Sequence, residues 1–338
     1  MNRGRDPVER ETSDDRDLYE ITTWERRSFL DSLAVGIHRF GAVSLRVVLV
    51  ALAFVLLLAQ LILGGVGVLV ADPVVGTLVF LSVVPALGIA VYIWYADVTT
   101  GEPLSLLVVT FLLAVLFAMF AAVINSVLQP AFGALGFLGL VLFFFLVVGP
   151  VEETVKLLAV RLYAYRSTRF DAVIDGMVYG AVAGLGFATI ENAFYITQGL
   201  DSGLAAMEVV DEAGATAAVR SLAGPGHVLY SAIAGFYLGL AKFNPENAGP
   251  IVIKGLTIAA ILHALYNSLA GIVPGLLVAS ATWITLPIAL LGFIVLYDGF
   301  VAYILYRKAS RYMKAYRDAG IERLDERELI PERTEFDP

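Results

Sequence analysis

The feature that most restricts this fold is a series of apolar runs, many of them about 18 residues or longer, between residues 47 and 306. Runs of that length can cross the roughly 30 Å hydrocarbon core of a bilayer as helices. Hydrophobic residues make up 59% of the 338-residue chain, more than the roughly 45–50% typical of soluble domains. The alternation that a membrane β-barrel requires is absent. We therefore predict an all-α, polytopic transmembrane helix bundle.

Short segments containing proline or glycine divide the apolar sequence into eight predicted spans. These spans cover residues 47–70, 74–95, 104–128, 134–162, 172–197, 222–241, 251–272 and 277–306. With an even number of spans, the lysines and arginines near the span ends all fall on one side, and basic residues mark the cytoplasmic side of a membrane protein. We therefore predict that the N- and C-termini are both cytoplasmic.

Composition excludes several classes of site and partner. The chain has no cysteine and a formal net charge of −8. It therefore lacks disulfides and thiolate metal ligands, and it offers no basic surface of the kind that binds nucleic acid. The expected partners are the lipid bilayer and a membrane protein substrate, without nucleic acid, and the expected location is the cell membrane.

Ionisable residues inside the predicted spans are concentrated in the second half of the chain, beginning with Glu152, Glu153 and Lys156. An ionisable residue at membrane depth is costly and indicates a functional site. Glu152 and Lys156 are four residues apart and can pair on one helix face, whereas Glu153 is rotated by about 100°. Two adjacent carboxylates cannot both ionise at low cost in a low dielectric. They form an acid–base pair suited to deprotonating water, although a structural Glu152–Lys156 ion pair is the alternative.

The predicted span 172–197 combines a glycine repeat with two polar residues. Gly176, Gly180 and Gly184 recur every four residues, a spacing that lets membrane helices approach closely. We interpret these glycines as packing residues. Glu191 and Asn192 then lie near the outer end of this helix, where they could orient a catalytic group, bind substrate backbone or simply face solvent.

Two of the three histidines, His227 and His263, fall within predicted spans. His263 shares a helix face with Asn267, four residues later. Counted at 1.5 Å per residue from the nearest basic residue, Glu153, His263 and His227 lie roughly 12, 14 and 22 Å from the cytoplasmic edge. We therefore predict that a cavity opening to the cytoplasmic side brings all three together. A purely structural interhelical contact is the alternative for each histidine.

In chain order, the motifs read Glu-Glu-x-x-Lys, Asp-Gly-x-x-Tyr-Gly-x-x-x-Gly-x-Gly-Phe-x-x-x-Glu-Asn-x-x-Tyr, a histidine, and His-x-x-x-Asn. Over about residues 134–270 this order resembles the PrsW family of intramembrane proteases. That family is similar in turn to the CPBP superfamily, which includes the CAAX prenyl endopeptidases. The resemblance implies hydrolysis of a peptide bond in a membrane-embedded or membrane-adjacent protein, as in regulatory, signal-releasing proteolysis.

The resemblance also implies roles for particular residues. The implied catalytic set is Glu152, Glu153, His227, His263 and Asn267, together with the Glu-Asn pair Glu191 and Asn192. Glu153, His227 and His263 would suffice as three ligands of a divalent metal such as zinc with one open position. Because no His-Glu-x-x-His is present, we favour a glutamate-activated water without metal, with the histidines holding the developing oxyanion.

Two other functional classes fit the same residues. Buried carboxylates could serve as a relay in an ion- or proton-coupled transporter, although the internal repeats typical of transporters are missing. A catalytically inactive membrane scaffold could bind client helices through the glycine face.

The predicted organisation places the functional residues in one part of the chain. Residues 1–22 are charged and are expected to be disordered, whereas residues 23–40 mix apolar and basic positions and could form an interfacial helix. The predicted regions are a cytoplasmic tail with the interfacial helix (1–46), accessory spans (47–130), the catalytic membrane core (131–272), a last span (273–306) and a charged cytoplasmic tail (307–338).

Overall fold

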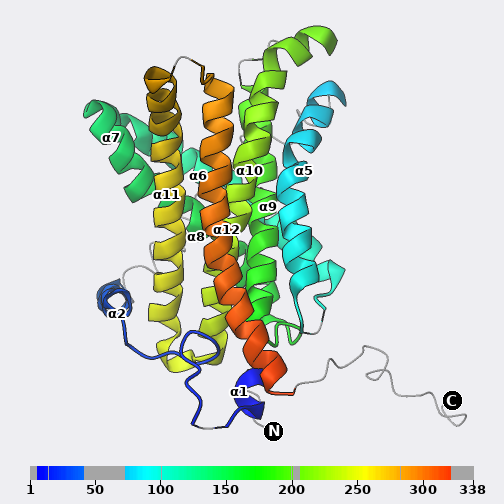
Figure 1. Cartoon of the computed structure of the whole chain (residues 1–338), viewed down its shortest axis with the longest axis vertical. Coiled ribbons are helices and arrows are strands. Elements are labelled where there is room, and N and C mark those ends of the chain that lie inside the picture. Colours follow the sequence, from blue (N-terminus) through cyan, green and yellow to red (C-terminus); the bar gives the residue numbers. More distant parts are fainter. Residues whose placement is uncertain are drawn as a thin grey trace, which may run out of the picture.

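The computed structural model describes residues 6–13, 15–41, 73–99, 101–198, 200, 206–281 and 283–320. Within these residues the chain is helical, without any β-strand, and its long helices lie side by side in a bundle (Figure 1). The predicted all-α class is confirmed. The first predicted span, residues 47–70, lies outside the described residues.

Two short helices precede the bundle, α1 (Pro7–Glu11) and α2 (Phe29–Gly41). The bundle consists of α5 (Pro73–Ala96), α6 (Leu104–Gly133), α7 (Gly136–Phe143), the π-helical turn η1 (Phe144–Val148), α8 (Gly149–Leu162), the short η2 (Ala164–Arg166), α9 (Val173–Thr197), α10 (Ala206–Phe243), the short η3 (Pro245–Asn247), α11 (Ala248–Ser280) and α12 (Leu286–Asp318).

In the described part of the chain, six helical stretches are long and apolar enough to cross a membrane. They are α5, α6, the stretch from α7 through η2, α9, the stretch of η3 with α11, and α12. The predicted span 222–241 lies inside α10, which runs along the bundle but falls outside these six. The predicted break at 272–277 is wrong, because α11 continues through Pro274 to Ser280. Proline is tolerated in membrane helices when neighbouring groups satisfy the freed carbonyl.

The prediction that residues 1–22 are disordered is wrong for the residues of this range that the structure describes, 6–13 and 15–22. These residues pack against the end of the bundle. The Asp6 carboxylate accepts a hydrogen bond of 2.9 Å from the Tyr312 hydroxyl of α12. Glu20 forms an ion pair with Lys254, which is 4% exposed on α11. The prediction failed because a buried lysine needs a carboxylate partner, and composition does not show that distant partner.

Helix α2 leaves an apolar stripe uncovered. Phe29, Leu33 and Ile37, spaced four residues apart, are 84%, 42% and 47% exposed. The helix is seen end-on beside α11, so it runs across the direction of the bundle (Figure 1). An exposed apolar stripe on a helix in this orientation is typical of an interfacial helix.

Helix α9 forms the centre of the bundle, since 94% of its most apolar window is buried. A Cβ atom at Gly176, Gly180 or Gly184 would clash with a backbone carbonyl oxygen of α10. For Gly184 that oxygen belongs to His227. The predicted packing role of these glycines is confirmed, and the close approach sets the position of a candidate site residue.

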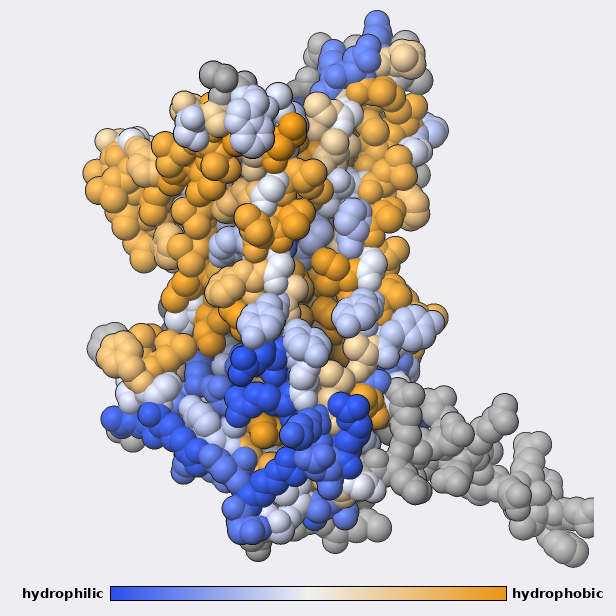
Figure 2. Space-filling view, viewed as in Figure 1, coloured by the Kyte–Doolittle hydropathy of each residue, from blue (hydrophilic) through white to orange (hydrophobic). Residues whose placement is uncertain are grey.

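The bundle has a polar end and an apolar flank. Hydrophilic residues gather at the end that carries α1 and the last turns of α12, whereas apolar side chains cover most of the visible flank above it (Figure 2). We call the first of these the terminal end.

Candidate active site

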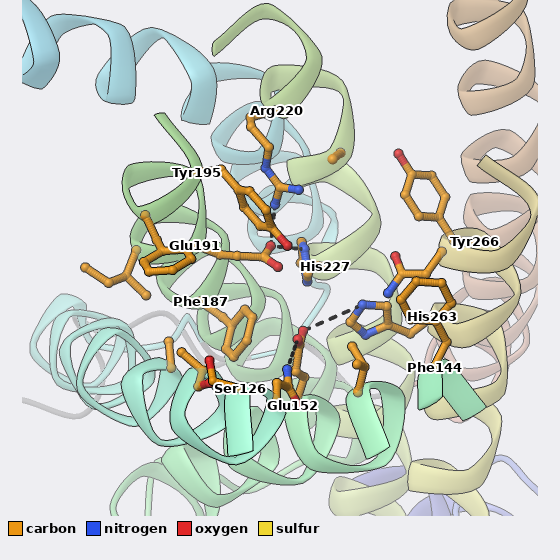
Figure 3. Close-up of a pocket in the computed structure, with 18 of the residues that line it drawn as sticks. Ser126, Phe144, Glu152, Phe187, Glu191, Tyr195, Arg220, His227, His263 and Tyr266 are labelled. Carbon is orange, nitrogen blue, oxygen red and sulfur yellow. Dashed lines mark hydrogen bonds and ion pairs between the residues drawn. The ribbon is translucent and has the colours of Figure 1, made fainter. Parts of the chain in front are cut away.

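Five of the seven predicted site residues line one cavity of about 570 Å³. The cavity lies among α6, α8, α9, α10 and α11, and Figure 3 shows the side chains of several lining residues directed into it. The five residues are Glu152, Glu191, His227, His263 and Asn267. The other two, Glu153 and Asn192, lie behind the lining.

The cavity extends away from the terminal end of the bundle, whereas the prediction was stated for the cytoplasmic side. Its lining includes Gln129, Gln198 and Arg220, which lie toward the opposite ends of α6, α9 and α10. On the terminal side, the cavity is blocked by packed side chains, since Lys156 and Glu153 are only 1% and 0% exposed. Depth counted along single helices could not show which side of the site is filled by packed side chains.

Glu152 lines the cavity with a carboxylate of which only one oxygen is hydrogen-bonded. Its Oε1 accepts a hydrogen bond of 3.0 Å from Asn125 Nδ2 on α6. Its Oε2 is buried and has no hydrogen-bond partner among the described residues, although His263 Nε2 lies 3.6 Å away. Leaving a buried carboxylate oxygen unpaired costs free energy, so an unpaired oxygen facing a cavity indicates a place for a water, a substrate atom or a metal.

Glu153 is fully committed to partners within the protein. Its Oε1 accepts from Lys156 Nζ at 2.6 Å and lies 2.9 Å from His263 Nδ1, and its Oε2 accepts from the Ser231 hydroxyl at 3.2 Å. Lys156 is 4.0 Å from Glu152, so its closer partner is Glu153 and not the predicted Glu152. Positions i+3 and i+4 are both within reach on a helix, and the sequence does not choose between them.

Both ring nitrogens of His227 and Nδ1 of His263 have a partner within hydrogen-bond distance. His227 Nδ1 lies 2.9 Å from Lys156 Nζ, and because an ammonium group can only donate, we infer that Nδ1 accepts and Nε2 carries the proton. That Nε2 lies 2.8 Å from Glu191 Oε2. For His263, the contact with Glu153 favours a proton on Nδ1, which leaves the Nε2 lone pair directed toward Glu152. The rings meet edge to face, with centroids 5.1 Å apart.

Glu191 and Asn192 bind the same arginine. Arg220 forms an ion pair with Glu191 and donates from Nε to Asn192 Oδ1 at 2.9 Å. The Asn192 amide in turn donates to the Ser82 hydroxyl of α5 at 3.0 Å. Asn192 therefore positions Arg220 from behind the cavity wall, while Glu191 reaches the cavity itself.

Three residues outside the predicted set belong to this site. We define the cavity cluster as Glu152, Glu153, Lys156, Glu191, Arg220, His227 and His263, with Asn125 bound to it. From the sequence, Lys156 was considered only as a partner for Glu152, and Asn125 and Arg220 were not selected as site residues. The available signal was a polar residue in an otherwise apolar run for Asn125, and the single basic residue of an acidic segment for Arg220.

The donor set that converges in the cavity differs from the predicted metal set. One ligand atom each of Glu152, His227 and His263 lies within 4.8 Å of the others, so Glu152 replaces the predicted Glu153. Adjacent helical residues are about 100° apart, and only Glu152 faces the cavity. One carboxylate and two imidazoles fit a catalytic divalent metal in donor type, provided that His227 Nε2 exchanges its contact with Glu191 for the metal.

Comparison with known proteins identifies similar chains. Residues 102–297 match the family model described as PrsW family intramembrane metalloprotease. The chain is 30% identical over 190 residues to Protease PrsW of Halalkalibacterium halodurans, covering 56% of this chain and 80% of that protein. It is 30% identical over 207 residues to Protease PrsW of Bacillus subtilis, covering 60% of this chain and 84% of that protein. No solved structure gives a significant match.

Proposed function

The chain belongs to the PrsW family of intramembrane metalloproteases, and from this premise we propose that Glu152, His227 and His263 form its hydrolytic centre. The predicted resemblance is confirmed, and the chain is an intramembrane endopeptidase. The observation that carries the proposed centre is the buried Glu152 Oε2, which faces the cavity without a hydrogen-bond partner among the described residues.

In the proposed reaction, Glu152 Oε2 takes a proton from a water as the water oxygen attacks the scissile carbonyl carbon. Asn125 holds the other oxygen of Glu152, which orients the carboxylate. The proton then passes to the leaving amine nitrogen as the C–N bond breaks. The Asn267 amide is proposed to stabilise the negative charge on the carbonyl oxygen. His263 Nε2, whose lone pair is oriented through the contact of Nδ1 with Glu153, is proposed to accept a hydrogen bond from the attacking water.

A divalent metal fits the donors Glu152, His227 and His263. When bound there, it would supply Lewis-acid polarisation of the scissile carbonyl. Glu153, which contacts His263 Nδ1, would then act as the carboxylate that orients a histidine ligand.

We propose eight crossings, with both termini in the cytoplasm. The six apolar stretches and α10 make seven passes along the bundle, and the predicted span 47–70 would be the eighth. Lys308 of α12 lies 3.5 Å from Glu20 of the N-terminal segment that carries α1, and Lys242 is in the last turn of α10, which ends on that side of the bundle (Figure 1). Cytoplasmic enrichment of such residues supports this orientation. The cavity would then face the outer half of the membrane.

The proposed substrate is a membrane-embedded or membrane-adjacent protein, cut in the outer half of the bilayer to release a signal. The proposed location is the cell membrane, and nucleic acid is not a proposed partner. Of the predicted regions, the catalytic core 131–272 extends in this proposal to include α6, because Asn125 binds Glu152. We retain the proposed boundaries of the tail with its interfacial helix (1–46), the remaining accessory spans, the last span (273–306) and the C-terminal tail (307–338).

The test is cleavage of a membrane-anchored reporter by the detergent-purified full-length protein. We expect Glu152→Gln and His263→Ala to abolish cleavage while the exposed-site control Glu246→Gln cleaves normally. Undiminished cleavage by either of the first two variants would refute the proposed centre. A chelator arm, with zinc added back, separates the metal-dependent reaction from the metal-free one. The transporter and scaffold alternatives gain no support from the comparisons.

A further inference from the structure

A second group of buried carboxylates lies away from the cavity cluster. Asp97, Glu102 and Asp175 are 4%, 4% and 0% exposed, and one oxygen of each lies within 4.8 Å of the others. Asp97 and Glu102 belong to the connection between α5 and α6, and Asp175 belongs to the first turn of α9. These segments meet toward the terminal end of the bundle (Figure 1). We call these three residues the terminal cluster.

Glu102 is the unusual member of the terminal cluster. Both of its carboxylate oxygens are buried, and apart from the Asp97 carboxylate and its own backbone N–H, Glu102 has no hydrogen-bond partner among the described residues. The Tyr179 hydroxyl, four residues after Asp175 on the same face of α9, is also buried without a partner in this part of the chain. A buried carboxylate left in this state is costly. Its oxygens are directed at two other carboxylates, so a positively charged ligand would relieve the cost.

The other two carboxylates are held in place. Asp175 Oδ2 accepts from the backbone N–H groups of Asp171 and Ala172 at 2.7 and 2.9 Å. The Thr99 hydroxyl lies 2.8 Å from Asp97 Oδ1 and 3.2 Å from Asp175 Oδ1. These contacts fix two oxygen donors from different elements before any ligand arrives, which lowers the cost of binding.

The protein supplies no paired cation for Glu102 or Asp175 in the described part of the chain. No lysine or arginine nitrogen there lies within the 4.0 Å of an ion pair with either residue. Lys242 interacts electrostatically with Asp175 but does not form an ion pair with it. Its ammonium group donates to the carbonyl oxygens of Tyr165 and Ser167 at 2.7 and 3.1 Å. The site therefore disfavours three uncompensated charges.

We propose that Asp97, Glu102 and Asp175 bind one hard divalent cation of the Ca²⁺ and Mg²⁺ class. Oxygen-only donors select these ions, whereas the imidazoles of the cavity cluster suit zinc. Three carboxylates from two elements offer a charged ligand set, and the Thr99 hydroxyl is adjacent to it.

Such a cation would fasten the connection between α5 and α6 to the start of α9. Helices α6 and α9 both extend from the terminal cluster to the cavity cluster, because α6 carries Asn125 and α9 carries Glu191. Asp175 and Glu191 are sixteen residues apart, or about 24 Å along the helix. The proposed site is therefore structural and separate from the hydrolytic centre.

The test uses full-length protein in detergent, stripped with EDTA and titrated with CaCl₂ or MgCl₂ at constant ionic strength. We expect the thermal midpoint of wild type to rise with cation concentration, and calorimetry to give one site. Glu102→Gln should weaken binding at least about tenfold, because it removes a charged ligand. Glu246→Gln, an exposed carboxylate change, and His263→Ala, in the cavity cluster, should both bind as wild type.

Tb³⁺ luminescence excited through tyrosine gives a direct measure of binding that does not depend on melting. If Glu102→Gln does not fold, the same luminescence measurement is made on a second variant, Asp97→Asn, which is also expected to bind the cation more weakly. The proposal is overturned if wild type shows neither a thermal shift nor bound cation, because the cluster is then held by shared protons alone. It is equally overturned if Glu102→Gln and Asp97→Asn bind with wild-type affinity.

Discussion

The cavity cluster and the terminal cluster each contain three carboxylates, but they compensate the charge differently. In the cavity cluster, Lys156 lies 2.6 Å from Glu153, and Arg220 pairs with Glu191. In the terminal cluster, neither Glu102 nor Asp175 has such a partner in the described part of the chain.

In the proposed roles, this difference in charge compensation separates a reactive site from a cation-binding site. In the cavity cluster, lysine and arginine side chains pair with Glu153 and Glu191. Glu152 Oε2 then remains without a hydrogen-bond partner inside the cavity, where it is available for the proposed reaction. Where the chain supplies no such side chain, a buried carboxylate must either hold a proton or bind a cation from outside. Counting carboxylates alone would have treated the two clusters as alike.

The largest expected effect comes from removing the spare oxygen of the cavity cluster. Glu152→Gln should lower reporter cleavage by about 10³-fold or more, because the amide cannot accept the proton from water. Glu153→Gln should retain more activity, since it disturbs only the orientation of His263. Initial cleavage rates of the two variants at equal protein concentration provide the check. An active Glu152→Gln beside an inactive Glu153→Gln would reverse the two roles.

Removing the built-in cation should make the cavity cluster resemble the terminal cluster. Lys156→Met leaves Glu153 buried without its ion pair, and losing one partner of a buried pair costs about 3–5 kcal/mol. We expect a large drop in the thermal midpoint in detergent. The double variant Glu153→Gln/Lys156→Met should recover part of that loss. A single variant as stable as wild type would show that the charge balance does not matter there.

The cavity cluster also depends on how closely α9 and α10 approach. Gly184→Ala places a methyl group against the carbonyl oxygen of His227 and should shift that side chain. A displacement of about 1 Å can cost about 10²-fold in rate, so we expect a loss of roughly that size with the helices still folded. Gly275→Ala, where a Cβ meets nothing within 4 Å, is the matched control. Equal activity of the two variants would contradict this account.

The smallest expected effect concerns a third way to compensate a buried carboxylate. Instead of pairing with a lysine or arginine or binding an external cation, the carboxylate keeps a proton. Burial raises the pKa of Asp6 to about 7, despite hydrogen bonds from Val8, Tyr312 and Val173, and the charge of Glu9 adds to the rise. Because the folded pKa lies above the ordinary value of 3.8, docking of the N-terminal segment is strongest at low pH. It should weaken as the pH rises from about 4 to 7.

Limited proteolysis near Arg10 at pH 5 and pH 8 measures this effect. Wild type should be cut faster at pH 8, after correction for the protease's own pH dependence on an unfolded peptide. Asp6→Asn should remove most of the difference. A pH effect of equal size in the variant would assign it to another group.

The sequence by itself determined the features that depend on local chemistry. Apolar runs predict membrane helices because bilayer thickness sets their length, and a four-residue glycine repeat predicts close packing because it marks one helix face. Ionisable residues at membrane depth are costly enough to indicate a site. For these reasons five of the seven predicted site residues line one cavity.

Only the tertiary structure decided which groups meet across helices. It turned Glu152 rather than Glu153 toward the cavity, and it brought Asn125 and Arg220 to residues 27 and 29 positions away. It also gathered the terminal cluster by bringing Asp175 to Asp97 and Glu102, which lie 78 and 73 positions earlier in the chain. The rotation of each helix about its axis and its choice of neighbours follow from packing of the whole bundle. No single stretch of the sequence determines that packing.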